Sequence, residues 1–343
     1  MTMPARLAWT LQSQSSIEPE RALENEVHPE ADSGDSNPSS FLMQNRRQWV
    51  VRVPAWILGL GAVLVAGLVQ HAMSRRALAG VQPLVVTVSV PPQAYLVERI
   101  GGERVEVHVM VPPGASPATF EPSPQELVAL GRSDLLVEVG HPDFLFEVRH
   151  LESFLKANPQ ILIVDMTAGQ EESCIAEQGG PLDDDPHIWL APERMRSAAF
   201  AIEAALVGLD PGGAPQYGQN LTKLLSDIER LDGEITQLMA GLEGRRFMVF
   251  HPAWSHLACE YGLLQMAIES EGKEPGPAQL VATIEEARDE GIRVVFVQKG
   301  FSDRSARVIA SELGARVESL DPLARDWLEN LRYSAERIAA AIR

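Results

Sequence analysis

Short apolar runs alternate with helix-like patterns over residues 84–164. The runs are rich in β-branched residues and have the length of a buried strand, and turns containing glycine or proline lie between them. Strands are expected at 84–90, 105–111, 134–140 and 161–164. Because strands that alternate with helices form parallel sheets, this region predicts an α/β lobe.

The longest helical pattern of the chain follows the break at Pro211–Gly213. Apolar residues recur there every three or four positions from Tyr217 to Leu242, as on one face of an amphipathic helix. The pattern covers about seven turns, whereas an average helix of a globular protein has about three. We therefore predict a linker helix at 212–243 that acts as a rigid spine between two lobes.

A second lobe repeats the first in kind beyond this helix. Strand-like runs occur at 246–250, 293–297 and 316–320, with helical patterns between and after them. The predicted fold class is α/β, with two lobes built on parallel-type sheets. We place the lobes at 80–210 and 244–343.

The amino-terminal part of the chain has a different composition. Residues 1–45 are rich in acids, serine and asparagine, so we predict disorder there. Residues 46–79 start with basic side chains and contain an uncharged apolar run at 53–74, which is long enough to cross a bilayer. This segment is a signal peptide or a membrane anchor, and we favour the anchor. If translation started at Met43, the chain would begin with an ordinary short basic leader. We therefore interpret residues 1–42 as an extension that is not part of the functional protein.

Charge and cysteine content limit the classes of function. With 343 residues and 45% hydrophobic content, the chain can build two ordinary cores. The formal net charge of -18 argues against nucleic-acid binding, which needs clustered Lys and Arg. The only cysteines, Cys174 and Cys259, lack the spacing of a metal knuckle. We expect two free thiols, and the alternative is a disulfide formed in an oxidising compartment.

Three side chains of metal-ligand type occupy comparable places in the two lobes. His187 follows an acidic loop and a proline, while His251 and Asp321 each come directly after a predicted strand. The carboxyl ends of strands face the ligand crevice in open α/β sheets. Two imidazoles and one carboxylate gathered from both lobes would suit Zn²⁺ or a similar divalent ion.

Four stretches carry a family resemblance, and they are Val111–Pro124, Asp185–Leu190, Phe250–Trp254 and Leu320–Leu323. From about Val85 onward, the chain resembles the periplasmic metal-binding components of zinc/manganese ABC importers, the cluster A-I solute-binding proteins. The resemblance implies two Rossmann-like lobes joined by one long rigid helix. It also implies a zinc or manganese ion as ligand, an ABC permease and its ATPase as partners, and a periplasmic or other extracytoplasmic location. We expect a monomer.

By this resemblance, the second, third and fourth metal ligands of the family correspond to His187, His251 and Asp321. The first ligand of the family is a histidine, and its position here is Ala118. Such a site should bind zinc more weakly or prefer another metal. Water or a nearby side chain could complete the coordination of the metal ion. The favoured side chains are Glu121, Glu269 and Glu271, and Gln93 and His141 are further candidates.

Two other functions share these residues. A metal ion with a vacant position could activate water for hydrolysis, with Glu121 or Glu271 as general base. The sequence has no HExxH, GxSxG or P-loop motif, so transport is favoured over catalysis. A surface adhesin or metal chaperone on the same fold is not separable from a transport protein by sequence. His256, one helical turn past Pro252, is expected at the surface.

Overall fold

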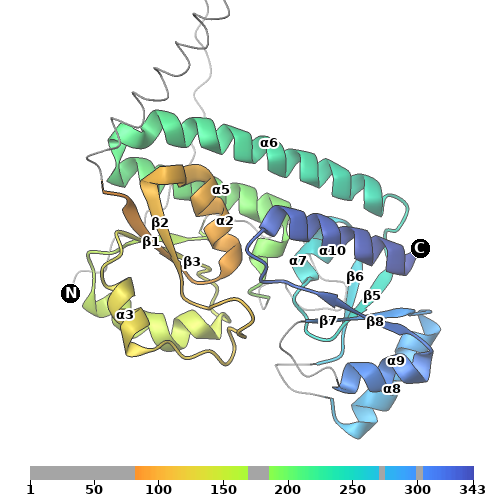
Figure 1. Cartoon of the computed structure of the whole chain (residues 1–343). Helices are drawn as coiled ribbons and strands as arrows, with labels where there is room; N and C mark the ends of the chain where they lie inside the picture. Colours follow the sequence, from red (N-terminus) through yellow and green to blue (C-terminus); the bar gives the residue numbers. More distant parts are fainter. Residues whose placement is uncertain (1–81, 169–184, 270–274, 299–303) are drawn as a thin grey trace, which may run out of the picture. The chain divides into compact units, whose positions relative to one another are not determined.

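The computed structural model describes residues 82–168, 185–269, 275–298 and 304–343 (Figure 1). The predicted disordered extension and the predicted signal or anchor segment therefore lie outside the described residues. Within the described ranges, no helix is both long enough and apolar enough to cross a membrane.

Four parallel strands form the sheet of the amino-terminal lobe, in the order β2-β1-β3-β4. The strands are β1 (Leu84–Val88), β2 (Val105–Val109), β3 (Leu135–Glu138) and β4 (Leu162–Asp165). All four strands predicted for this lobe are confirmed. The inner strands β1 and β3 are largely buried, as expected for a parallel sheet that helices cover on both faces.

The helices of this lobe follow the strands as a doubly wound fold requires. They are α2 (Pro91–Gly101), α3 (Pro124–Leu130), α4 (Glu152–Ala157) and α5 (Pro192–Leu209), with the short turns η1 (Gly102–Arg104), η2 (Glu147–Leu151) and η4 (Ile188–Leu190). Ser123 caps α3, because its hydroxyl accepts the N–H of Glu126 at 3.3 Å and the Glu126 carboxylate accepts the N–H of Ser123 at 2.6 Å.

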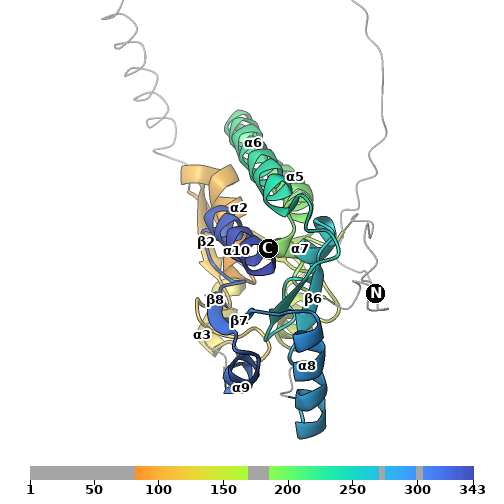
Figure 2. The same ribbon diagram turned by 90° about the vertical axis from the view of Figure 1, so that its right-hand side faces the viewer.

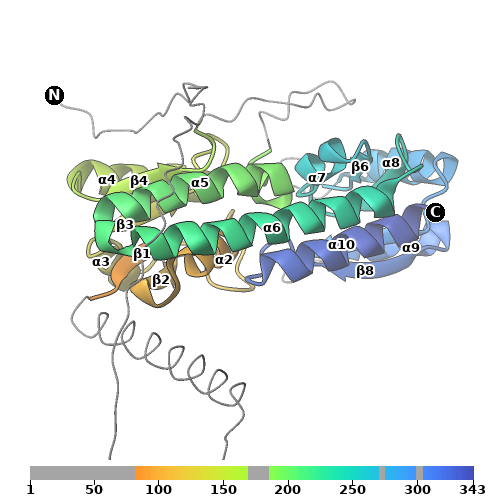
Figure 3. The ribbon, with the colours of Figure 1, turned by 90° about the horizontal axis from the view of Figure 1, so that it is seen from above.

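One long helix, α6 (Ala214–Met239), joins the two lobes and follows the turn η5 (Pro211–Gly213). It has 26 residues, which corresponds to a length of about 39 Å. Its buried residues recur every three or four positions from Tyr217 to Met239. This stripe packs against α2 and α5 of the first lobe and against α10 (Trp327–Ile342) of the second (Figure 3). The predicted long helix between the lobes is confirmed, with observed bounds Ala214–Met239.

The sheet of the carboxyl-terminal lobe repeats the first, with four parallel strands in the order β6-β5-β7-β8. The strands are β5 (Arg246–Val249), β6 (Leu264–Ala267), β7 (Val294–Gln298) and β8 (Arg316–Leu320). Three of these were predicted. Strand β6 was not, because its sequence Leu-Gln-Met-Ala contains no β-branched residue.

Helices cover both faces of the second sheet. Besides α10 they are α7 (Ser255–Glu260), α8 (Pro277–Asp289) and α9 (Arg304–Leu313). Met248 and Phe250 pack with residues of α8 and α9, whereas Phe247 and Val249 pack with residues of α7 and α10. This alternation is the period of two that a strand imposes. Figure 2 shows α10 between α6 and the sheet, and α8 and α9 beyond it.

Two buried tryptophans tie the lobes together. The indole N–H of Trp189 donates to the carbonyl of Pro322 at 2.7 Å, and the indole N–H of Trp327 donates to the carbonyl of Trp189 at 2.6 Å. Both rings are almost completely buried. Because a buried donor that loses its acceptor is costly, these bonds resist separation of the lobes.

Cys259 on α7 is disulfide-bonded, so the expectation of two free thiols is wrong. The other cysteine of the sequence, Cys174, lies outside the described residues. Sequence spacing alone could not reveal a bond here, because distance along the chain does not measure distance in space.

Candidate metal centre

His187 stands at the end of the loop that leads into η4 and α5. Its backbone N–H and its ring Nδ1 both lie within bonding distance of Asp185 Oδ1, at 2.9 and 2.6 Å. Pro186 favours an extended backbone at Asp185, and the aspartate side chain then folds back as an Asx turn. Both side chains are largely buried. The imidazole is thereby held in one orientation.

His251 lies two residues beyond the end of β5. Its Nδ1 is 2.6 Å from Oε1 of Glu269, a buried carboxylate that follows the neighbouring strand β6. Parallel neighbours end at the same edge of the sheet, which brings the two residues together. Each of the two imidazoles, His187 and His251, therefore has a carboxylate from its own lobe at Nδ1, an arrangement typical of metal-binding histidines.

The Nε2 atoms of His187 and His251 lie 3.3 Å apart, although the two residues belong to different lobes. Their carboxylate partners assign the proton of each neutral ring to Nδ1, so both lone pairs are on Nε2. Two lone pairs that face each other repel unless a cation or a proton lies between them. Two nitrogens that are each about 2.05 Å from a tetrahedral zinc ion are about 3.3 Å apart. The pair thus has the spacing of two ligands of one zinc ion.

Asp321, the third predicted ligand, follows β8 directly. Its Oδ1 accepts the backbone N–H of Leu323 at 2.9 Å. The bond from Trp189 to the carbonyl of Pro322 places the Asp321 loop against the loop of His187. In the parts of the chain that the structure describes, no three His, Cys, Asp or Glu side chains form a group that could hold a metal ion. The structure brings the two imidazoles together and leaves Asp321 outside such a group.

A buried negative charge lies behind His187. Burial raises the pKa of Asp185, but the charge and hydrogen bond of His187 and the charge of His256 outweigh it and hold this pKa far below its usual range. The second oxygen of the carboxylate, Oδ2, is buried and has no hydrogen-bond partner within the described part of the chain. An ionised Asp185 favours a cation on the far side of the imidazole that it orients.

His256 is buried, which corrects the expectation of a surface histidine. Its Nε2–H donates to the backbone carbonyl of Asp185 at 2.7 Å, and burial lowers the pKa of His256. A residue of α7 in the second lobe therefore supports the loop that carries His187 in the first. A position one helical turn past Pro252 is compatible with either face of the helix, so its local sequence did not reveal this contact.

The residues predicted as candidates for a further metal donor differ in burial and in their hydrogen bonds. Gln93 is buried, and its amide accepts a backbone N–H at 2.9 Å and donates to a methionine sulfur at 3.2 Å. His141 is a buried loop residue whose Nδ1 accepts a backbone N–H at 3.1 Å. Glu269 orients an imidazole, as described above. Glu121 is exposed, and Glu271 lies outside the described residues.

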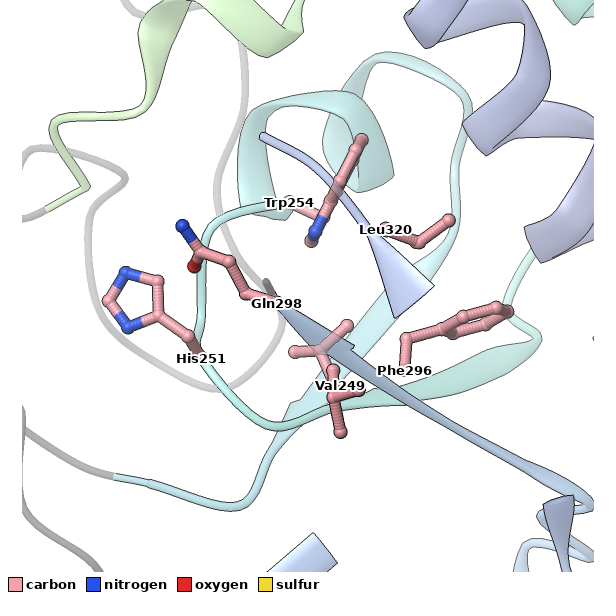
Figure 4. A pocket seen from close by; sticks show the side chains of 7 residues that line it. Val249, His251, Trp254, Phe296, Gln298 and Leu320 are labelled. Atoms are coloured by element: carbon pink, nitrogen blue, oxygen red, sulfur yellow. The ribbon is translucent and has the colours of Figure 1, made fainter. Parts of the chain in front are cut away.

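A small cavity of about 10 Å³ lies at the carboxyl ends of β5, β7 and β8 (Figure 4). Its lining residues are Val249, His251, Trp254, Phe296, Val297, Gln298 and Leu320. The amide of Gln298, the last residue of β7, extends to the same side as the His251 ring (Figure 4). Sequence reasoning missed Gln298 because an uncharged amide is a weak ligand signal. Its place at the end of a strand was the clue available.

Comparison with known proteins identifies the family. A family model described as ZnuA, the periplasmic component A of a zinc-uptake complex, matches residues 86–341. The chain belongs to this family. Membership confirms the resemblance read from the motifs, and the two α/β lobes joined by α6 agree with it.

Two crystal structures of ZnuA are similar to this chain, one of them a deletion mutant with zinc bound. Each is 40% identical in sequence, has a TM-score of 0.70 and covers 76% of this chain, matching 100% and 98% of the solved chains. The high-affinity zinc uptake system protein ZnuA of Bacillus subtilis is 26% identical over 245 residues, which is 68% of this chain and 76% of that protein.

Proposed function

We propose that this chain is the extracytoplasmic solute-binding component of an ABC importer for a divalent metal ion, with zinc as the favoured cargo and manganese as the second. It captures the ion between its lobes and delivers it to a membrane permease that an ATPase drives. One observation carries the proposal: two imidazoles, each with a carboxylate at Nδ1, face each other at 3.3 Å through Nε2. Membership of the zinc-uptake family supports the choice of cargo.

The proposed ligands are His187, His251 and Asp321. Two neutral imidazoles and one carboxylate form an established donor set for zinc, and the carboxylate offsets part of the charge of the ion. The long helix α6 and the hydrogen bond between Trp189 and Pro322 limit how far the lobes can separate. Capture and release would then depend on small movements of the ligand loops.

We also propose how the chain is divided and located. The lobes comprise 80–210 and 244–343, and the linker helix comprises 212–243. Segment 46–79 directs export, and its apolar run at 53–74 anchors the protein at the membrane as a monomer. Sequencing the amino terminus of the native protein tests this, because cleavage after the apolar run would contradict the anchor.

Zinc titration tests the proposed function. The full chain should bind zinc, and His187→Ala and His251→Ala should each weaken binding strongly. His108→Ala is the matched control, because His108 is a solvent-exposed histidine on β2. Wild-type affinity weaker than about 10 µM, or about -7 kcal/mol, would count against a dedicated zinc carrier. A zinc-soaked crystal with the ion bound away from both imidazoles would also contradict the proposal.

A further inference from the structure

Gln298 carries a buried oxygen, Oε1, that has no hydrogen-bond partner among the residues that the structure describes. The residue lines the small cavity beside His251. Buried side-chain oxygens are nearly always bonded to protein, water or a ligand. The cavity of about 10 Å³ has room for one water molecule or one ion. The oxygen is therefore available to whatever occupies that cavity.

The strand register places Gln298 beside His251. Val249 pairs with Phe296 across β5 and β7, and the N–H of Phe250 continues the ladder with a 2.8 Å bond to the carbonyl of Phe296. His251 and Gln298 each lie two residues beyond this last pair. Since side chains alternate between the faces of a strand, both point to the same side, as Figure 4 shows. Neighbouring strands are about 4.8 Å apart, so the two side chains can reach a common atom.

Gln298 also lies between the strands that carry two proposed ligands. In the order β6-β5-β7-β8, strand β7 separates β5, which leads to His251, from β8, which leads to Asp321. Gln298 pairs with Leu320, the residue before Asp321. An ion bound by both His251 and Asp321 must therefore lie over the end of β7. The β5–β7 boundary is also where the strand order reverses, the place where open parallel sheets bind ligands.

We propose that Gln298 is a further metal ligand, whose amide oxygen Oε1 binds the ion that His187 and His251 hold. This proposal rests on the metal-binding function proposed above. Two imidazoles and one carboxylate leave a four-coordinate ion one donor short, and the amide oxygen supplies that donor without adding charge. Carbonyl-type oxygens suit harder ions such as manganese better than nitrogen donors do. Gln298 would thus extend the range of the site from zinc toward manganese.

Competitive titrations of the full chain with zinc and with manganese test this assignment. Gln298→Leu should weaken zinc affinity at least about tenfold and manganese affinity more. Gln298→Glu should strengthen manganese affinity, because it replaces a neutral oxygen by a charged one. Gln237→Leu, the same change at an exposed position of α6, is the matched control and should change neither affinity. The metal-free Gln298→Leu variant should melt no lower than wild type, because it removes an oxygen without a partner.

A second readout separates a ligand from a packing role. The visible spectrum of the cobalt-loaded protein depends on the number of donors, so it should change in Gln298→Leu and stay the same in the control. Wild-type zinc affinity and an unchanged cobalt spectrum in Gln298→Leu would overturn the proposal. Equal weakening by Leu and Glu would overturn it as well, since only packing would explain that result. Failure of the underlying function looks different, because wild type and His251→Ala would then bind zinc equally poorly.

Discussion

Replacing Glu269 by leucine tests whether zinc affinity depends on the carboxylate that orients His251. Glu269 is buried, and its Oε1 lies 2.6 Å from Nδ1 of His251. A hydrogen bond to a charged group contributes about 1.5–3 kcal/mol, and each 1.4 kcal/mol changes a dissociation constant about tenfold. Glu269→Leu should therefore weaken zinc binding roughly 10- to 100-fold. Glu269→Gln keeps an acceptor without the charge, so its affinity should lie between those of Glu269→Leu and wild type.

The assay is competition for zinc against a chromogenic chelator at neutral pH, with circular dichroism to confirm that each variant is folded. Glu286→Leu is the control, because Glu286 is an exposed carboxylate on α8 that pairs with Arg246 at 3.4 Å. Its zinc affinity should stay within about twofold of wild type. A folded Glu269→Leu variant with wild-type affinity would refute the reasoning, since the orientation of His251 would then not depend on its carboxylate.

Two further outcomes are expected. Burial raises the pKa of Glu260 from 4.5 to about 7, so its ionisation removes stability as pH rises through that window. Urea denaturation should therefore show Glu260→Gln more stable than wild type by about 2–3 kcal/mol at pH 8, with no such gain at pH 4. Trp327→Phe leaves the buried carbonyl of Trp189 without a donor and should lower the free energy of unfolding by about 1–3 kcal/mol, also by urea denaturation.

Much of the fold could be predicted because most strands can be recognised from their own residue composition. Every described strand except β6 contains at least one β-branched residue, and in Leu84–Val88 they are the majority. Such residues favour strands. The missed strand, Leu264–Ala267, contains no β-branched residue, and only its pairing with Arg246–Val249 makes it a strand. That pairing depends on packing between segments distant in sequence, which a local pattern does not contain.

In the site, too, contacts between residues close in sequence could be predicted, whereas contacts between distant residues could not. Asp185 is two residues from His187, so its orienting role depends on a local turn. Glu269 is 18 residues from His251, and its role appears only once the two strands before them are paired. The opposition of the two imidazoles, whose residues are 64 positions apart, depends on the packing of both lobes along α6.

The two sheets share one strand order but differ chemically where that order reverses. In the first lobe, the last pair between β1 and β3 is Val88 with Val137, and the residues two positions further are Val90 and Val139. Both of these valines are completely buried. Their apolar side chains extend the core of the lobe, so these two positions offer no donor for an ion.

At the corresponding positions the second lobe has His251 and Gln298, two polar side chains that the proposed site uses as ligands. In that proposal the first lobe would contribute His187 from a loop outside its sheet. Zinc should therefore bind first to the second lobe and be enclosed when His187 approaches. On this reasoning His187→Ala retains weak zinc binding, whereas His251→Ala loses more, and titration of both variants measures the difference. Equal losses would mean that neither lobe holds the ion alone and that the imidazoles act only as a pair.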